Sequence, residues 1–179
     1  MKYICLNLSI LKKYFCGILP MEYVRMRKLS LLKKNGDFVI LNIGNEHWFV
    51  VQRHAKDRIY IFDSIGGIML PPDLKSICFN LLSIDHKLNK LFYDFPKRAL
   101  QDTNALTCGE HCIVYLIRKC YHTSHRSFEE GNYSHSLLEY CQKHSISPDE
   151  CVWREVYYIW KLAKVPNLRQ VVEWYCEEI

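Results

Sequence analysis

Four residues that could carry nucleophilic chemistry occur in the order His47, Asp63, Gln101 and Cys108. Cys108 stands where a polar loop enters an apolar stretch of helical length. Its thiol would therefore face the unpaired backbone N–H groups of a first helical turn, which stabilise a thiolate. Such a thiol needs a base, and His47 is the best candidate because it opens an apolar β-branched run directly after Gly44-Asn45-Glu46. Either residue alone is more often structural, but together they are candidates for catalysis by a cysteine nucleophile.

The other two residues could complete such a site. A third group must orient the imidazole, and Asp63 ends the next apolar run, 16 residues after His47. An antiparallel pair of strands with a turn near residues 54–57 would bring both side chains to one sheet edge. Gln101 lies seven residues before Cys108, where its amide could donate a hydrogen bond to an oxyanion. Gly109 would let substrate backbone approach closely.

Three apolar runs with short polar connections must position His47 and Asp63. They are rich in β-branched residues and extend from Asp37 to Gly44, from His47 to Arg53 and from Arg58 to Asp63. The short connections predict an antiparallel meander. A further strand is expected from Lys90 to Phe95, where Pro96 ends it.

Helices are expected mainly in the second half of the chain. Pro71-Pro72-Asp73 opens an earlier helix through about Leu82, with proline at its start and an acid in its first turn. The later helices are expected over residues 108–120, 134–143, 148–164 and 167–177. Strands first and helices afterwards predict an α+β fold, and the length predicts one domain over residues 1–179.

Composition limits the classes of partner and compartment. With 24 Lys and Arg against 19 Asp and Glu, the net charge is +5, which permits contact with nucleic acid without requiring it. The basic residues are concentrated in the first 34 positions, where a solvated face is the simplest interpretation. No apolar run approaches the length of a membrane helix, and no cleavable signal is evident, so neither a membrane protein nor a secreted one is expected.

Nine cysteines are present, an odd number without paired metal-binding spacing. We therefore expect a reducing intracellular compartment rather than a disulfide framework. Cys108, His111 and Cys112 are spaced along one helical face, with further cysteines and histidines nearby, but this spacing matches no zinc finger or ribbon. Neither a metal site nor a required cofactor is predicted.

The ordered set resembles the catalytic residues of the adenovirus endopeptidase (adenain) family and of the related SUMO- and ubiquitin-like-protein-specific cysteine proteases. The residues that carry this resemblance are His47-Trp48, Phe62-Asp63, Gln101 and Cys108-Gly109. The spacing from Gln101 to Cys108 is similar to the adenain branch. Upstream segments at residues 14–20 and 38–42 extend the likeness, which covers roughly residues 14–120.

The resemblance implies both a fold and a set of roles. The fold would be papain-like or adenain-like, with a central mixed β-sheet flanked by helices and the nucleophile at the N-terminus of a buried helix. Cys108 would be the nucleophile, His47 the base, Asp63 the third member and Gln101 the oxyanion donor. Trp48 and Gly109 would bind substrate.

Two features depart from the adenain pattern. Adenain has glutamate at the third position, whereas this chain has Asp63, as SUMO proteases do. The last 55 or so residues match no motif of either branch.

The resemblance favours a viral maturation endopeptidase that cleaves virion precursor proteins near small residues such as glycine. It implies stimulation by DNA and by a peptide from a capsid precursor, neither of which can be assigned to residues here. The expected location is the host nucleus or cytoplasm, with packaging into virions.

Two alternative functions remain open. One is a protease that removes SUMO or ubiquitin-like modifiers, and the other is a non-catalytic binding module. The short segment before His47 leaves little room to hold a folded modifier, and the intact four-residue set argues against a binding module.

Overall fold

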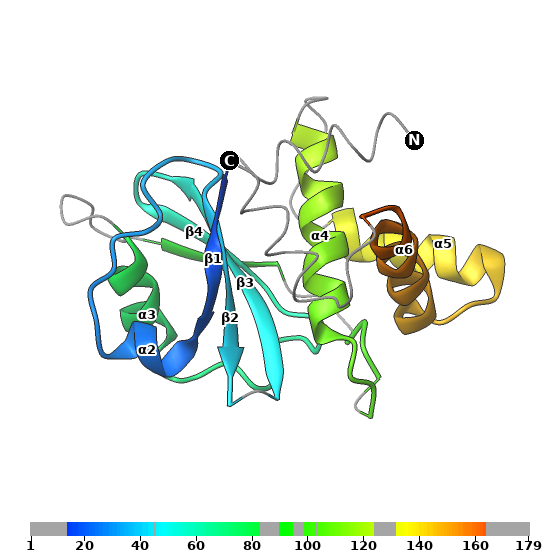
Figure 1. The fold of residues 1–179 in the computed structure, drawn as a ribbon, viewed down its shortest axis with the longest axis horizontal. Coiled ribbons are helices and arrows are strands. Elements are labelled where there is room, and N and C mark those ends of the chain that lie inside the picture. The colour runs from blue at the N-terminus through cyan, green and yellow to red at the C-terminus, as the bar shows by residue number, and fades with distance from the viewer. Residues whose placement is uncertain are drawn as a thin grey trace. The chain divides into compact units, whose positions relative to one another are not determined.

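The apolar runs form a mixed β-sheet, seen in the computed structural model of the chain (Figure 1). The structure describes residues 14–44, 46–82, 90–94, 99–102, 104–123 and 132–163. Within these residues the sheet has five strands, in sheet order β1 (Phe15–Pro20), β2 (Phe38–Ile43), β3 (His47–Ala55), β4 (Arg58–Phe62) and β5 (Lys90–Asp94).

The pairing pattern makes the sheet mixed. β2, β3 and β4 are antiparallel neighbours, whereas β1 and β5 lie parallel to β2 and β4 at the two edges. The predicted meander and the strand from Lys90 are therefore confirmed. Strand β1 was not predicted; in it Gly17 has a φ of +131° and the register shifts between Phe15 and Ile18. Glycine inside a strand weakens the strand signal, because it often marks a bulge.

Two short helices, α2 (Met21–Arg25) and α3 (Leu74–Leu81), pack against one face of the sheet (Figure 1). Alternate strand residues point toward them, as the two-residue period of a strand requires. The core of this unit includes Val39, Leu41, Phe49, Val51, Ile59 and Ile61 from the strands and Val24, Ile77 and Leu81 from the helices. Each such large apolar side chain contributes roughly 1.5–3 kcal/mol when fully buried.

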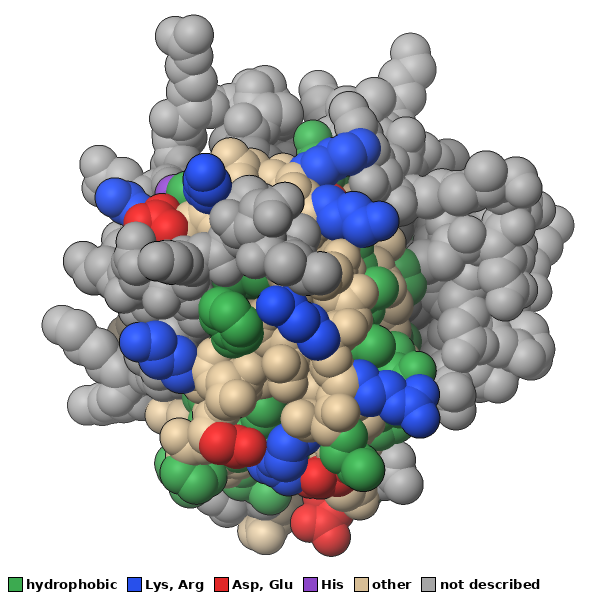
Figure 2. All heavy atoms as spheres, turned by 90° about the vertical axis from the view of Figure 1, so that its left-hand side faces the viewer, with side chains coloured by type: hydrophobic (Ala, Val, Ile, Leu, Met, Phe, Trp, Pro, Cys, Tyr) green, Lys and Arg blue, Asp and Glu red, His purple; other side chains and the backbone are tan. Residues whose placement is uncertain are grey.

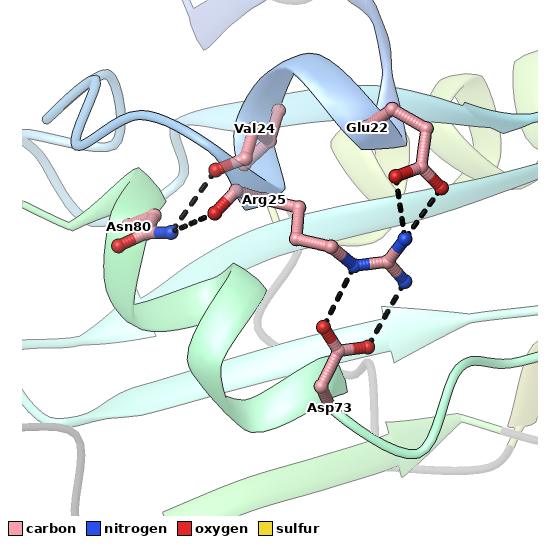
Figure 3. Close-up of polar contacts among 5 residues, drawn as sticks. All are labelled: Glu22, Val24, Arg25, Asp73 and Asn80. Atoms are coloured by element: carbon pink, nitrogen blue, oxygen red, sulfur yellow. Dashed lines mark hydrogen bonds and ion pairs between the residues drawn. The ribbon is translucent and has the colours of Figure 1, made fainter.

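Arg25 joins α2 to α3 (Figure 3). Its Nε and NH2 groups donate to the two carboxylate oxygens of Asp73 at 2.7 and 3.0 Å, and its NH1 group contacts Glu22. Asn80 on α3 donates to the carbonyl oxygens of Val24 and Arg25. Hydrogen bonding from Arg25 lowers the pKa of Asp73. Asp73 precedes α3 and makes no capping bond, so the expected acid in the first turn of this helix is wrong.

The basic segment after β1 forms a solvent-exposed face (Figure 2). Figure 2 shows Lys and Arg side chains spread over this face, with Asp and Glu side chains among them. The exposed basic residues of the segment are Arg25, Arg27, Lys28, Lys33 and Lys34. Lys28 and Arg27 lie over the rings of Phe79 and Tyr23. Lys12 and Lys13 lie outside the described residues.

Helices dominate the described residues after Leu100. They are α4 (Cys108–Thr123), α5 (Asn132–His144) and α6 (Pro148–Ala163). Their buried residues include Val114, Leu116, Leu137, Val152 and Val156, together with Tyr115 and Tyr133, whose rings meet edge to face. All three helices were predicted, with ends displaced by a few residues. The helix expected over residues 167–177 lies outside the described residues.

These elements define two compact units. The sheet unit is Tyr14–Ala99, and the helical unit is the described chain from Leu100 onward. The α+β class is confirmed by the mixed sheet and the helices. The single-domain assignment for residues 1–179 stays a prediction. Among the described residues, no helix combines the length and apolar character needed to cross a bilayer.

Candidate active site

His47 and Asp63 meet at one end of the sheet. His47 is the first residue of β3, and Asp63 directly follows β4. Val50 pairs with Phe62 in the antiparallel register, so His47 and Asp63 are diagonal neighbours on the same face. His47 Nε2 lies 2.7 Å from Asp63 Oδ1. The predicted proximity of His47 and Asp63 at one sheet edge is therefore confirmed.

The carboxylate of Asp63 is fixed by two further donors. Oδ1 also accepts the backbone N–H of Ile65 at 3.1 Å, and Oδ2 accepts that of Gly67 at 2.9 Å. The side chains of His47 and Asp63 are 2% and 0% exposed. A carboxylate only accepts, so His47 Nε2 is the donor in this bond. The turn after β4 thus holds the carboxylate, and the carboxylate holds the ring.

Trp48 and Asn42 occupy paired positions next to the histidine. Asn42 on β2 faces Trp48 in the register, and its side-chain amide donates to the carbonyl oxygen of His47 at 3.3 Å. Trp48 is half-buried. Its expected contact with substrate stays a prediction.

Cys108 is the first residue of α4. The N–H of His111 donates to the carbonyl oxygen of Thr107 at 2.9 Å, which makes Thr107 the residue that caps the helix. The N–H groups of Cys108, Gly109 and Glu110 then have no acceptor inside the helix, and they lie at its positive end. The Cys108 side chain is 5% exposed. The predicted place of Cys108 at a helix N-terminus is confirmed, and its role as nucleophile stays a prediction.

Burial makes four other thiols poor nucleophiles. Burial is the main cause that raises the pKa of Cys16 to about 11 and that of Cys151 to about 12. Burial also raises the pKa values of Cys78 and Cys141. These four thiols therefore carry little thiolate near neutral pH.

Gln101 lies at the other end of loop 101–107 and is 7% exposed. Its Nε2 donates to the carbonyl oxygen of Ala105 at 2.5 Å, so the side chain forms a hydrogen bond within its own loop.

The loop also contains a turn at Asp102. Asp102 Oδ1 accepts the N–H of Asn104, and Ala105 N–H donates to the carbonyl oxygen of Asp102. The sequence predicts an Asx turn at Asn104. The structure centres it on Asp102, because a carboxylate accepts from the amide two residues later.

Asp149 contacts this loop but was not predicted as part of the site. It lies in the first turn of α6 and accepts hydrogen bonds from Thr107 Oγ1, His111 Nε2 and the Asp102 N–H. Only its position after Ser147-Pro148, a helix-start pattern, was evident from sequence. Nothing in local spacing connects it to residues about forty positions earlier.

The four predicted residues are thus divided between the two units. His47 and Asp63 are in contact in the sheet unit, and Gln101 and Cys108 lie at the two ends of one loop in the helical unit. Over the described residues, no group of three or more His, Cys, Asp or Glu side chains is arranged to hold a metal ion. No protein-family model, curated protein or solved structure matches this chain.

Proposed function

We propose that the chain is a cysteine endopeptidase of the adenain type, with Cys108, His47, Asp63 and Gln101 as its catalytic residues. The observation that carries the proposal is the buried bond between His47 Nε2 and Asp63 Oδ1. Removing an ionisable pair from water is costly unless both partners are hydrogen-bonded, and here the carboxylate has three donors. Such a fixed imidazole–carboxylate pair is what a cysteine nucleophile needs as its base.

The bond to Asp63 decides which ring nitrogen reacts. Because Nε2 donates to the carboxylate, Nδ1 takes the proton from the Cys108 thiol. The thiolate attacks the scissile carbonyl carbon and forms a C–S bond. Nδ1–H then protonates the leaving amine as the C–N bond breaks. Water, activated by the same nitrogen, hydrolyses the thioester and restores the thiol. The proposal requires His47 and Cys108 to meet in the active enzyme.

The oxyanion is assigned two donors. The backbone N–H of Cys108 is at the open end of α4, and the Gln101 amide carries two N–H groups. The bond to Ala105 restricts the side chain. A donor of this kind is worth about 2.7–4 kcal/mol in the transition state. The papain-like fold belongs to the same proposal; the mixed sheet and the cysteine at the start of α4 are what such a fold requires.

The substrate class follows from the resemblance rather than from the geometry. We favour virion precursor proteins cleaved near glycine, with Trp48 and Gly109 contacting the substrate. The second candidate is a protease that removes SUMO or ubiquitin-like modifiers, and Asp63 in place of glutamate is the feature that favours it. A binding module without catalysis is the weakest alternative.

The partners and the location of the protein are proposed from its surface charge, its free thiols and the adenain resemblance. The exposed basic face supports weak DNA binding that does not depend on sequence (Figure 2). Stimulation by DNA or by a viral peptide would follow the adenain pattern. The six cysteines that the structure places are all free thiols, which supports a reducing compartment such as the host nucleus or cytoplasm, with packaging into virions.

The test is a cleavage profile of the purified protein on a peptide library, beside a panel of ubiquitin and SUMO activity probes. Cleavage of short peptides near glycine, abolished in Cys108→Ala, supports the endopeptidase. Labelling by modifier probes without peptide cleavage supports the second candidate. No turnover and no labelling of Cys108 would reject both.

A further inference from the structure

Asp149 contacts the residues beside both Gln101 and Cys108. Its Oδ2 accepts the backbone N–H of Asp102 at 2.8 Å, and its Oδ1 accepts the hydroxyl of Thr107. Asp102 follows Gln101 directly, and Thr107 directly precedes Cys108. One carboxylate on α6 therefore fixes both ends of loop 101–107.

A third bond joins the same carboxylate to the body of α4. His111 Nε2 lies 3.1 Å from Asp149 Oδ1, and the His111 side chain is fully buried. The other ring nitrogen, Nδ1, is buried and has no hydrogen-bond partner among the residues that the structure describes. The bond to Asp149 is therefore what orients this ring, one helical turn after Cys108.

The charge of Asp149 is maintained in this setting. Burial alone would raise the pKa of Asp149, but hydrogen bonds from His111, Thr107 and the Asp102 amide together lower it. Ser147 caps α6 by accepting the N–H of Glu150, so Asp149 lies in a first turn that favours a negative charge. The acceptor is thus ionised at neutral pH and can serve three donors at once.

We propose that Asp149 is a positioning residue, which holds loop 101–107 so that the Gln101 amide and the Cys108 thiol keep their mutual placement during catalysis. The inference rests on the proposed function, because it concerns the same reaction. It also assigns a catalytic contribution to the part of the chain for which the adenain resemblance offers no counterpart. A displacement of about 1 Å at a reacting group can lower a rate by about 10²-fold.

The matched pair of variants is Asp149→Asn and Glu150→Gln. Both remove one negative charge from the first turn of α6. In Asp149→Asn the new amide would turn an NH₂ group toward one of the three donors, whereas the Glu150 carboxylate pairs with the exposed Arg154. We expect Asp149→Asn to lower kcat on a peptide substrate by about 10- to 100-fold with KM little changed. Glu150→Gln should keep the wild-type rate.

A second pair tests the same contact with less risk to folding. Thr107→Val keeps the shape of the side chain and removes the hydroxyl that donates to Asp149, whereas Thr107→Ser keeps the hydroxyl. We expect Thr107→Val to lower kcat by roughly tenfold and Thr107→Ser to retain most activity. Circular dichroism and thermal melting of all four variants would show that each one is folded.

A double-variant cycle separates positioning from general stability. If Asp149 acts through Gln101, the loss in Asp149→Asn/Gln101→Ala should be smaller than the product of the two single losses. Wild-type kcat in both Asp149→Asn and Thr107→Val, or losses that multiply in the double variant, would overturn the inference while leaving the endopeptidase intact. A wild-type protein without any turnover contradicts the proposed function, and with it the reaction that Asp149 would support.

Discussion

In the sheet unit His47 and Asp63 are placed by strand register, whereas in the helical unit Gln101 and Cys108 are placed by a loop that a distant carboxylate holds. The histidine and aspartate are on adjacent strands joined by a short turn, and their contact follows from the pairing of Val50 with Phe62. Loop 101–107 instead depends on Asp149, 47 residues after Asp102.

The difference shows how the two halves would tolerate change. Strand register is supported by the whole β3–β4 ladder, so substitutions near His47 or Asp63 should leave the backbone in place. Loop 101–107 has no such ladder, so the loss of one acceptor can move Gln101 and Cys108 together. Substitutions in each half should therefore differ in the size and the kind of their effect.

The largest effect is expected from removing the thiol or its base. Cys108→Ala should abolish turnover with the fold intact, since the change is small and lies at a helix start. His47→Ala should be nearly as severe, because in the proposed mechanism His47 both accepts the thiol proton and protonates the leaving amine. Each loss should reach about 10⁴-fold or more in kcat. Steady-state peptide hydrolysis and circular dichroism are the measurements.

An electrophilic peptide probe tests the assignment of the nucleophile independently. It should label Cys108 before the other eight cysteines, four of which have raised pKa values. Mass spectrometry that finds the label mainly on another cysteine would show that Cys108 is not the nucleophile.

Removal of Gln101, the proposed oxyanion donor, should have the next largest effect. Gln101→Ala removes one side-chain donor and leaves the backbone N–H of Cys108. The expected loss in kcat is about 10²–10³, with little change in KM, because the donor acts on charge that develops in the transition state. Gln101→Glu is a useful second variant, because it keeps the size of the side chain but replaces the NH₂ donor with an oxygen atom. A wild-type kcat in Gln101→Ala would remove the residue from the mechanism.

Asp63→Asn should retain some activity and change the pH profile. The substitution removes the anion that stabilises the protonated ring of His47, so the limb of the profile that reports His47 should shift to lower pH. The new NH₂ group would also face the Gly67 N–H, whose hydrogen bond Asp63 Oδ2 accepts in the wild-type protein. The loss of this acceptor should lower the free energy of unfolding by roughly 1–3 kcal/mol. An unchanged pH profile and melting temperature would mean that the bond between His47 and Asp63 has no part in catalysis.

Local patterns predicted most of the sheet and the main helices. The β-branched runs around Leu41 and Ile61 and the short turns fix the meander, and with it the contact of His47 with Asp63. The apolar stretch after Cys108 predicts α4 and the place of the thiol. The sequence does not predict β1, because Gly17 interrupts this short strand, which pairs in parallel with β2.

Long-range polar contacts could not be predicted in the same way. Asp149 resembles any acid at a helix start, and its bonds to Asp102 and Thr107 depend on how α6 packs on α4. Arg25 and Asp73 likewise pair across 48 residues. A hydrogen bond between distant residues has no periodicity, so the sequence carries no local signal for it.

The smallest effect concerns the basic face of the sheet unit. Binding of the protein to duplex DNA should be weak to moderate, independent of sequence and steeply dependent on salt, because each neutralised phosphate releases counterions.

Lys33 is a suitable residue to test this binding. Its backbone N–H and carbonyl oxygen bond to Asp37 and Arg53, but its exposed side chain can be changed without breaking these bonds. Lys33→Gln should lower the slope of log K against log salt by about 0.9 if the side chain contacts one phosphate. Lys143→Gln removes one exposed positive charge from α5 and should leave that slope unchanged. Fluorescence anisotropy between low and moderate salt measures both slopes. Equal slopes for the two variants would show that the basic face does not contact DNA, and an affinity that does not change with salt would exclude electrostatic binding altogether.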